Sequence, residues 1–344
     1  MHKKTVAFSK HSSNLFFHIL TKCNLACRHC YINREQHGAN TLDIDTIKNW
    51  LDLFVNKNRQ MNLIFLGGEP TLHPDLSIAV KHAKKAGFKS ITIDTNGYLF
   101  NNILDKISCD EVDFISFSLD GATKKTNDAI RGKGSFDQCL KGLKDAQAKG
   151  FSTSMIYTVS NDNIDELAMM PAVVKALKIE RFFIQVIGIR GKSSGINRLV
   201  NPPLDQSVNQ NSKSQVTKDK WLHTVPKIAE EIAENNIIVT YPKVFLKKSE
   251  KFECAAMFAE NYFVFPNKRV YQCPVCEDLP IHSLEIDNNQ LIKTGKINEK
   301  DLFTLSIPEG CVMNKLVQPG NLVYNKDGTP KYKIACCMLK QEFS

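Results

Sequence analysis

The chain has 344 residues, 42% of them hydrophobic and 24% charged, and its formal net charge is +9. This composition supports a large core and excludes a mainly disordered protein, and the length allows about two domains. No apolar run approaches the ~20 residues that cross a bilayer, and no signal-peptide core follows the basic start. We therefore expect a cytoplasmic protein with no membrane partner. The Lys and Arg residues form no long block, so nucleic-acid binding is not predicted either.

The chain contains eleven cysteines, and a cytoplasmic protein keeps its thiols reduced. Such a number favours metal ligation or redox chemistry over disulfides. Three of them, Cys23, Cys27 and Cys30, lie within eight residues as C-x3-C-x2-C. A zinc site or a fully ligated [4Fe-4S] cluster takes four protein ligands, so a set of three predicts a cluster with one open iron. A structural metal site with a distant fourth cysteine is the alternative.

Short β-branched or aromatic runs alternate with amphipathic segments from residue 14 onward. The expected strands cover residues 14–20, 62–66, 90–94, 112–119, 154–159 and 181–187. Helical periodicity lies between them, for example over residues 44–55 and over residues 136–149, where Gly150 follows as a helix-ending residue. This alternation predicts an α/β fold with a parallel sheet and right-handed crossovers. Six such units are too few for a full barrel and suit a partial (β/α)6 barrel of the TIM type.

The loops that follow these strands are rich in Gly and polar residues. They are GGEP at residues 67–70, TNG at 95–97, DG at 120–121, Gly188, and the cysteine loop itself. Any one of these loops alone is more simply interpreted as an ordinary turn. The carboxyl ends of parallel strands meet at one rim, however, and this rim is where barrel folds build their active sites. We therefore expect the five loops to lie together.

The pattern changes after residue 190. Residues 191–220 are polar and predict a surface insertion, either a lid or a linker, and a helix at 221–235 and a strand at 237–241 follow. A hairpin is then expected from residues 262–265 and 270–272. These features divide the chain into a barrel at 1–190, an insertion or linker with a helix and strand at 191–250, and a Cys-rich domain at 251–344.

Together, C-x3-C-x2-C, GGEP, TNG and SLDG resemble the radical S-adenosylmethionine (SAM) superfamily over about residues 14–190. A looser resemblance, over about residues 254–337, is to the auxiliary-cluster domain called twitch, or SPASM in its longer form. The resemblance implies a partial barrel with a [4Fe-4S] cluster on Cys23, Cys27 and Cys30, whose open iron is chelated by SAM. It also places His29 against the adenine of SAM.

The same resemblance assigns further SAM contacts by position. Gly67, Gly68 and Glu69 would hold the amino group of SAM. The residues matched to its ribose or methionine carboxylate are Asn96, Ser118, Asp120 and Arg131. The implied chemistry is reductive cleavage of SAM to methionine and a 5'-deoxyadenosyl radical, which takes a hydrogen atom from the substrate. An electron donor such as flavodoxin or ferredoxin is implied as a partner, and no residue is assigned a catalytic role.

The C-terminal region contains six more cysteines, namely Cys254, Cys273, Cys276, Cys311, Cys336 and Cys337. Two complete auxiliary clusters need seven or eight ligands, so one auxiliary [4Fe-4S] cluster fits better. The expected ligands are the first three and one of the last three. Neighbours such as Cys336 and Cys337 rarely reach the same iron, which leaves one of them spare or facing substrate. The region departs from the SPASM pattern at Lys268, where that pattern has glycine, and a structural zinc site is the alternative.

The remaining conspicuous residues are interpreted as structural. Cys109 and Cys139 stand alone, and both are expected to be small buried hydrophobic residues. Lone histidines such as His18, inside the first strand, are interpreted as satisfied structural side chains.

The predicted function is that of a radical SAM enzyme that modifies a peptide or protein side chain. The first expected strand begins near residue 14, so we expect no N-terminal peptide-recognition domain. This keeps a small-molecule substrate open, as in a tetrapyrrole or pterin step of cofactor biosynthesis. Functions of other classes are a non-catalytic iron-sulfur electron carrier and a zinc-binding module, but neither needs GGEP, TNG and SLDG.

Overall fold

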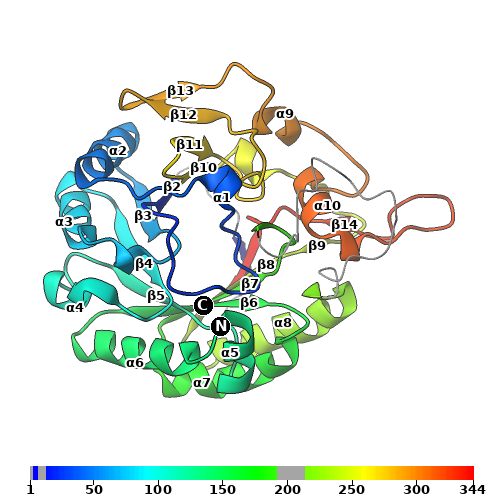
Figure 1. The fold of residues 1–344 in the computed structure, drawn as a ribbon. Helices are drawn as coiled ribbons and strands as arrows, with labels where there is room; N and C mark the ends of the chain where they lie inside the picture. The colour runs from blue at the N-terminus through cyan, green and yellow to red at the C-terminus, as the bar shows by residue number, and fades with distance from the viewer. Residues whose placement is uncertain (1–2, 7–12, 192–213) are drawn as a thin grey trace.

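The computed structural model describes residues 3–6, 13–191 and 214–344, and most of its strands belong to a single mixed sheet. The parallel strands at its centre are β2 (Ser13–His18), β3 (Met61–Leu66), β4 (Ser90–Thr95), β5 (Phe114–Ser118), β6 (Thr153–Val159), β7 (Arg181–Val186) and β8 (Ile238–Pro242). Each pairs with the next in chain order. The six expected strands and the partial barrel are therefore confirmed, and the strand expected at 237–241 joins them beside β7 (Figure 1).

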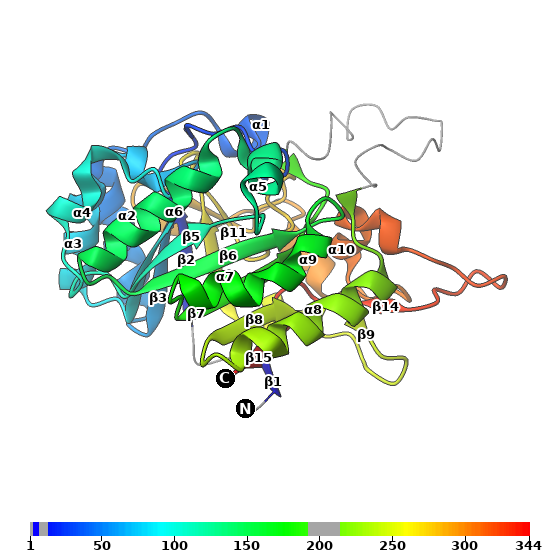
Figure 2. The ribbon, with the colours of Figure 1, turned by 90° about the horizontal axis from the view of Figure 1, so that it is seen from below.

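Helices cover the outer face of this curved sheet (Figures 1 and 2). They are α2 (Ile44–Lys57), α3 (Leu76–Ala86), α4 (Ile103–Lys106), α5 (Lys124–Arg131), α6 (Ser135–Ala148), α7 (Met170–Ala176) and α8 (Lys218–Ala233). α2 begins where Asp43 accepts a hydrogen bond from the Thr46 backbone N–H at 2.8 Å, which satisfies one free donor of the first turn. Gly150 follows α6 with φ of +87°, as its prediction as a helix-ending residue requires.

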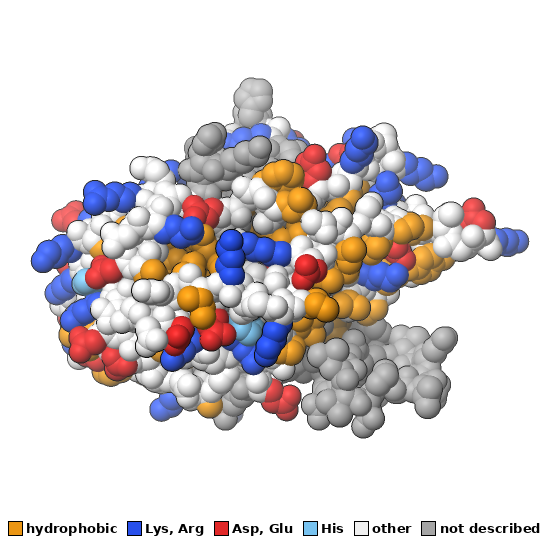
Figure 3. Space-filling view, turned by 90° about the horizontal axis from the view of Figure 1, so that it is seen from above, with side chains coloured by type: hydrophobic (Ala, Val, Ile, Leu, Met, Phe, Trp, Pro, Cys, Tyr) orange, Lys and Arg blue, Asp and Glu red, His pale blue; other side chains and the backbone are white. Residues whose placement is uncertain are grey.

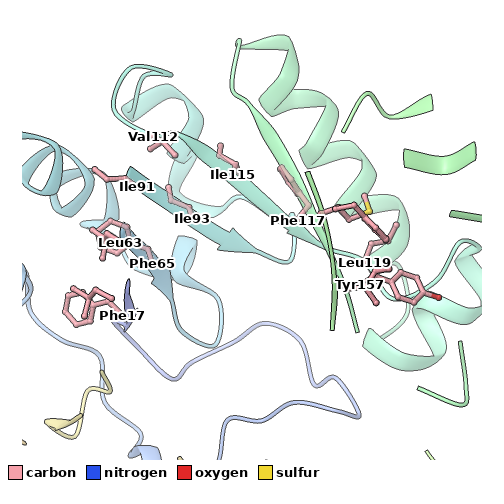
Figure 4. Packing of buried hydrophobic residues seen from close by; sticks show 14 of the residues in the cluster. Phe17, Leu63, Phe65, Ile91, Ile93, Val112, Ile115, Phe117, Leu119 and Tyr157 are labelled. Atoms are coloured by element: carbon pink, nitrogen blue, oxygen red, sulfur yellow. The ribbon is translucent and has the colours of Figure 1, made fainter. Parts of the chain in front are cut away.

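Side chains alternate between the two faces of each barrel strand. One set packs outward against the helices in the main hydrophobic core and includes Phe17, Leu63, Phe65, Ile93, Phe117 and Tyr157 (Figure 4). The residues between them point into the barrel, and among these are Phe16, His18, Asp94, Ser118 and Ile156. The outer face thus packs into the main core, while the inner face presents both polar and apolar side chains to a cavity.

The C-terminal region continues the same sheet on both sides. β10 (Glu260–Val264) runs parallel to β2 and forms the expected hairpin with β11 (Arg269–Tyr271), and β12 (Leu284–Asp287) and β13 (Gln290–Lys293) follow. At the other side, β15 (Lys340–Phe343) lies antiparallel to β8, and β1 (Lys3–Val6) lies against β15. Hydrogen bonds between strands join the three expected parts of the chain in one sheet. The boundaries expected at residues 190 and 250 stay a prediction.

The smaller elements surround the open side of the barrel. They are α1 (Arg34–His37), α9 (Glu299–Phe303), α10 (Val312–Val317) and the pair β9 (Phe245–Leu246) and β14 (Lys333–Ile334). Most of the insertion expected at 191–220 lies outside the described residues. Within the described part of the chain, no helix has the length and apolar character that crossing a bilayer requires.

Candidate active site

A cavity of about 370 Å³ lies inside the barrel and reaches the carboxyl ends of its strands. Its wall contains nearly all the residues matched to the radical SAM pattern, namely Cys23, Cys27, His29, Cys30, Gly67, Gly68, Glu69, Asn96, Ser118 and Arg131. Asp120 is the exception. The loops that the sequence places after different strands therefore meet around one space, as the parallel topology predicts.

The cysteine loop is held by main-chain contacts with its neighbours. The backbone N–H of Glu69 donates to the Lys22 carbonyl at 3.0 Å, directly before Cys23. A Cβ on Gly67 would stand 2.7 Å from the Leu20 carbonyl oxygen, and one on Gly68 would come closer still to that of Lys22. GGEP thus needs its two glycines so that the second strand's loop can approach the cysteine loop.

Glu69 joins GGEP to TNG. Its buried carboxylate accepts hydrogen bonds from the backbone and hydroxyl of Thr71, at 3.1 and 2.6 Å, and from the Thr95 hydroxyl at 2.9 Å. The Asn96 backbone N–H donates to the other carboxylate oxygen at 2.8 Å. Burial raises the pKa of Glu69, and these donors oppose that rise by favouring the ionised form. The carboxylate is held in one orientation at the cavity wall.

Asn96 in turn contacts the cysteine loop. Its side-chain amide donates to the Asn24 side chain at 2.8 Å and lies 3.8 Å from the Cys23 sulfur. An N–H group so close to the sulfur would tune the reduction potential of a cluster that Cys23 ligates. TNG therefore orients the loop as well as lining the cavity.

Asp120 lies behind the cavity wall and holds two residues that face it. One carboxylate oxygen is 2.6 Å from Arg131 Nε and 3.2 Å from His29 Nε2, and the other accepts from the Thr158 backbone N–H at 2.7 Å. Asp120 is fully buried. Burial lowers the pKa of His29, and the Asp120 charge opposes this. The structure thus puts Asp120 out of direct contact with the cavity and in a position to orient His29 and Arg131.

The three thiols of the cysteine loop fit a cluster that is ligated from one side. All three are free, half-buried and turned towards the same cavity. Burial raises the pKa of Cys23 to about 11 and also raises that of Cys27, so metal binding has to displace their protons. Within the described residues, no three His, Cys, Asp or Glu side chains are grouped closely enough to hold a single metal ion. The thiol set therefore differs from a preformed single-ion site.

Comparison with known proteins identifies this part of the chain. Residues 18–170 match the radical SAM superfamily. The chain carries a radical SAM domain. Its relatives include the Fe-coproporphyrin III synthase of Methanosarcina barkeri, 30% identical over 53% of this chain and 45% of the relative. Another is the mycofactocin maturase MftC of Mycobacterium tuberculosis, 29% identical over 59% of this chain and 54% of the relative. These matches span about half the length of the curated relatives.

A solved structure shows the same fold over nearly the whole chain. Streptococcus suis SuiB, bound to its precursor peptide SuiA, superposes with a TM-score of 0.60 at 13% identity, covering 95% of this chain and 70% of SuiB. The likeness extends beyond the radical SAM domain into the Cys-rich region. At this level of identity it establishes the fold alone.

The six C-terminal cysteines converge beside the radical SAM domain. Five of them line a small apolar cavity of about 20 Å³, and Cys276 packs in the same cluster of buried residues. The thiols of Cys254 and Cys336 form a hydrogen bond, as do those of Cys273 and Cys276. Burial raises the pKa of Cys311 to about 12. Cys337 lines both this cavity and the main one, and the expectation that at least one of the adjacent pair is spare or faces substrate stays a prediction.

The two remaining cysteines belong to neither group. Cys139 is buried, as expected, and its thiol lies 3.6 Å from the Ser118 carbonyl. The expectation that Cys109 is buried is wrong, because Cys109 is exposed. It occupies a turn between α4 and β5, and the helical periodicity that would bury it has ended there.

Sequence reasoning missed several residues that face the main cavity. His18 accepts a hydrogen bond from the Tyr31 hydroxyl at 2.7 Å, and its other nitrogen contacts the Val264 carbonyl at 3.1 Å. Burial lowers the pKa of His18 to about 3, so it is neutral. The Arg190 guanidinium stacks 4.9 Å from the Tyr31 ring and pairs with Glu277 at 3.1 Å. The period-two pattern of the first strand indicates that His18 faces inward, but no local pattern marks Arg190.

Proposed function

We propose that this protein is a radical SAM enzyme that modifies a peptide or protein side chain and uses an auxiliary iron-sulfur cluster. The observation that carries the proposal is the meeting of the Cys23, Cys27 and Cys30 thiols with Glu69 on one cavity wall. An electron carrier needs the thiols but has no use for a buried, oriented carboxylate beside them.

Each group of residues on the cavity wall would have its own role. The three thiolates would hold a [4Fe-4S] cluster, which when reduced supplies the electron that cleaves SAM to methionine and a 5'-deoxyadenosyl radical. Glu69 would accept the SAM ammonium together with Gly67 and Gly68, whose backbone approaches the cysteine loop too closely for any Cβ. Arg131, set by Asp120, offers a cation for the methionine carboxylate. Ser118 and Asn96 would contact SAM from neighbouring loops, and His29 would pack on the adenine.

An auxiliary [4Fe-4S] cluster on the C-terminal cysteines completes the proposal. Six thiols from four segments gather around one small cavity, which is more than one metal ion needs. Cys254, Cys273 and Cys276 with Cys311 or Cys336 are the proposed ligands, because Cys337 also reaches the main cavity. A flavodoxin or ferredoxin would donate electrons. We place the enzyme in the cytoplasm, whose reducing conditions preserve eleven free thiols.

The substrate class has two candidates. A peptide is supported by the fold shared with SuiB, solved with a precursor peptide, and by the sequence match to a maturase. A small-molecule step of cofactor biosynthesis is the alternative, and the match to Fe-coproporphyrin III synthase favours it.

The test is anaerobic reconstitution followed by product analysis. We expect about eight iron atoms per chain, as two [4Fe-4S] clusters require. We also expect 5'-deoxyadenosine from SAM and dithionite, and deuterium in that product when a labelled peptide substrate is added. Zinc in place of iron, or no 5'-deoxyadenosine from the iron-loaded protein, would refute the proposal. Label transfer from a tetrapyrrole or pterin precursor instead would establish the alternative substrate class.

A further inference from the structure

The inner part of the main cavity, below the cysteine rim, contains a pair of opposite charges. Asp94 on β4 and Lys340 on β15 both line the cavity. Asp94 lies opposite Ser116 in the β4–β5 pair, and the Ser116 hydroxyl donates a hydrogen bond to its carboxyl group. Burial raises the pKa of Asp94 to about 7. Burial also lowers the pKa of Lys340, and the charges of Cys337 and Asp94 oppose that lowering. The cavity wall therefore carries one acidic and one basic side chain, and the charge of each acts on the other.

The surroundings of this pair are suited to a neutral, partly apolar ligand. Gln185 on β7 lines the same space, and its side chain is exposed within the barrel. Phe16 and Phe263 stack at 4.5 Å between ring centroids, with their planes nearly parallel, and both line the cavity. The inner cavity thus combines one acceptor, one donor and one amide with an aromatic wall.

The charge balance of the wall argues against an anionic ligand. Three Lys or Arg side chains occur among the described residues that line the cavity, and the charge of a carboxylate acts on each of them. Arg131 pairs with Asp120, Arg190 pairs with Glu277, and Lys340 is influenced by Asp94. A molecule with several carboxylates would therefore meet no excess of positive charge, and Glu69 and Asp94 would repel it.

The size of the cavity leads to the same conclusion. Its volume of about 370 Å³ is near the lower end of the range of roughly 300–1,000 Å³ for ligand sites. SAM has to occupy part of that space under the proposed function. What is left suits one side chain or a short stretch of peptide better than a complete macrocycle. The surface above the C-terminal strands likewise mixes acidic, basic and apolar side chains (Figure 3).

We propose that Asp94 and Lys340 form a substrate subsite that binds an amide group of a peptide. In this subsite the Lys340 ammonium donates to the amide carbonyl oxygen and the Asp94 carboxylate accepts from the amide N–H. The Gln185 side chain can donate to the same carbonyl oxygen or accept from the same N–H. Phe16 and Phe263 offer an apolar wall for a neighbouring side chain. The inference rests on the proposed function, because it specifies the part of the substrate that this radical SAM enzyme recognises.

The test compares two small probes on the reconstituted, SAM-loaded full chain at pH 8 without reductant. N-acetylalanine methylamide represents a peptide unit, and propionate represents the side-chain acid of a tetrapyrrole. Binding is followed by saturation-transfer NMR titration on the wild type, Asp94→Asn and Lys340→Met. Asp105→Asn and Lys149→Met are matched controls. Lys149 Nζ lies 2.6 Å from an Asp105 carboxylate oxygen in a surface ion pair, and neither residue lines the cavity. Circular dichroism verifies that each variant is folded, and each is judged separately.

We expect the wild type to bind the diamide more tightly than propionate. Asp94→Asn should weaken diamide binding about tenfold and strengthen propionate binding, because it removes an acceptor and a repelling charge. Lys340→Met should weaken both about tenfold, and both controls should behave as the wild type. Tighter propionate than diamide binding in the wild type, no diamide binding at all, or wild-type diamide affinity in both cavity variants would overturn the inference. The proposed function is tested separately, by metal content, SAM cleavage and label transfer, whereas probe binding requires no turnover.

Discussion

The two cysteine groups of this protein are built in opposite ways. Cys23, Cys27 and Cys30 come from one loop, are half-buried and line a cavity of about 370 Å³. The C-terminal six come from four segments between residues 254 and 337, are mostly buried and surround a cavity of about 20 Å³. The first group is accessible to a ligand the size of SAM, whereas the second is enclosed by hydrophobic side chains.

This difference indicates how each group depends on the rest of the fold. The N-terminal loop carries its three thiols on one short segment, and hydrogen bonds from the neighbouring loops, such as those from Glu69 to Lys22 and from Asn96 to Asn24, hold its shape. The C-terminal group exists only after distant segments have packed, so its ligation should be coupled to folding. Loss of the first group should therefore cost chemistry, and loss of the second should cost structure as well.

The largest expected effect is that of removing the N-terminal group. The triple variant Cys23→Ala, Cys27→Ala, Cys30→Ala should lose about four iron atoms per chain and all formation of 5'-deoxyadenosine. The fold should persist, because these side chains belong to the cavity wall and not to the main core. Iron analysis, electron paramagnetic resonance and product assay measure the outcome.

Cys109→Ala is the matched control, since Cys109 is exposed and lines neither cavity. It should retain the full iron content and rate. If the triple variant gave the same resonance spectrum as the wild type, the N-terminal loop would not hold a cluster, and the contrast between the two groups would disappear.

The next effect concerns the C-terminal group. Cys273→Ala with Cys276→Ala should remove about half of the iron and lower the thermal stability of the holoprotein, while the resonance signal of the N-terminal cluster remains. The thiols of this pair contact each other within the buried cluster. A variant that lost iron without losing stability would show that this region folds independently of ligation.

Glu69→Gln tests the oriented carboxylate. A carboxylate accepts charge-assisted hydrogen bonds worth roughly 1.5 to 3 kcal/mol, so SAM affinity should fall on the order of 10- to 100-fold. The substituted amide also turns a donor towards Thr71, Thr95 or Asn96, which already donate. Equilibrium binding of SAM to the reconstituted protein gives the result.

Glu166→Gln separates the loss of affinity from the loss of stability. Glu166 also accepts hydrogen bonds from threonines, at 2.8 Å from the Thr123 hydroxyl and 2.5 Å from that of Thr126, but it is absent from the cavity wall. The Glu166→Gln variant should be less stable to unfolding than the wild type and should bind SAM with the same affinity. Equal SAM affinities for Glu69→Gln and the wild type would refute the assigned role.

The barrel could be predicted from sequence because its information is local. Each strand is a short β-branched or aromatic run, each helix shows its own periodicity, and all six expected strands lie within two residues of the observed ones. The pairing of β10 with β2 could not be predicted. It joins residues almost 250 positions apart, and such pairing depends on tertiary packing that leaves no local pattern.

The candidate site, like the fold, could be predicted from sequence only in part. The motifs predicted the cavity wall, but not that Asp120 would lie behind it, since the four letters SLDG do not show which way a side chain turns. Asp94 lies within a strand, and the alternation of that strand could have placed it inside the barrel. Lys340 reaches the cavity only because β15 pairs with β8.

The smallest effect concerns His37, which joins the segment after the N-terminal cysteine loop to the C-terminal cysteine region at Glu277. Its Nε2 donates to the Glu277 carbonyl at 3.1 Å and its Nδ1 accepts from the Asn33 N–H at 3.0 Å, so a second proton would face a donor. Burial lowers the pKa of His37 to about 3, against 6.5 when unfolded. The unfolded chain therefore binds the extra proton between these values, and stability is lost as pH falls below 6.5. Between pH 7 and 5 the loss should be about 2 kcal/mol.

His37→Gln keeps a donor and an acceptor but cannot titrate, so it should lose about 2 kcal/mol less than the wild type over the same interval. Urea unfolding of the anaerobically reconstituted protein, followed by fluorescence of the buried Trp50 and Trp221, measures both. His223→Gln, on the exposed face of α8, should follow the wild type. His18 and the buried carboxyl groups titrate alike in all three proteins, so their contributions cancel in the comparison. An equal loss in His37→Gln and the wild type would mean that His37 can accept its second proton in the folded state, and that the packing of Asn33 and Glu277 around it is looser than the hydrogen bonds indicate.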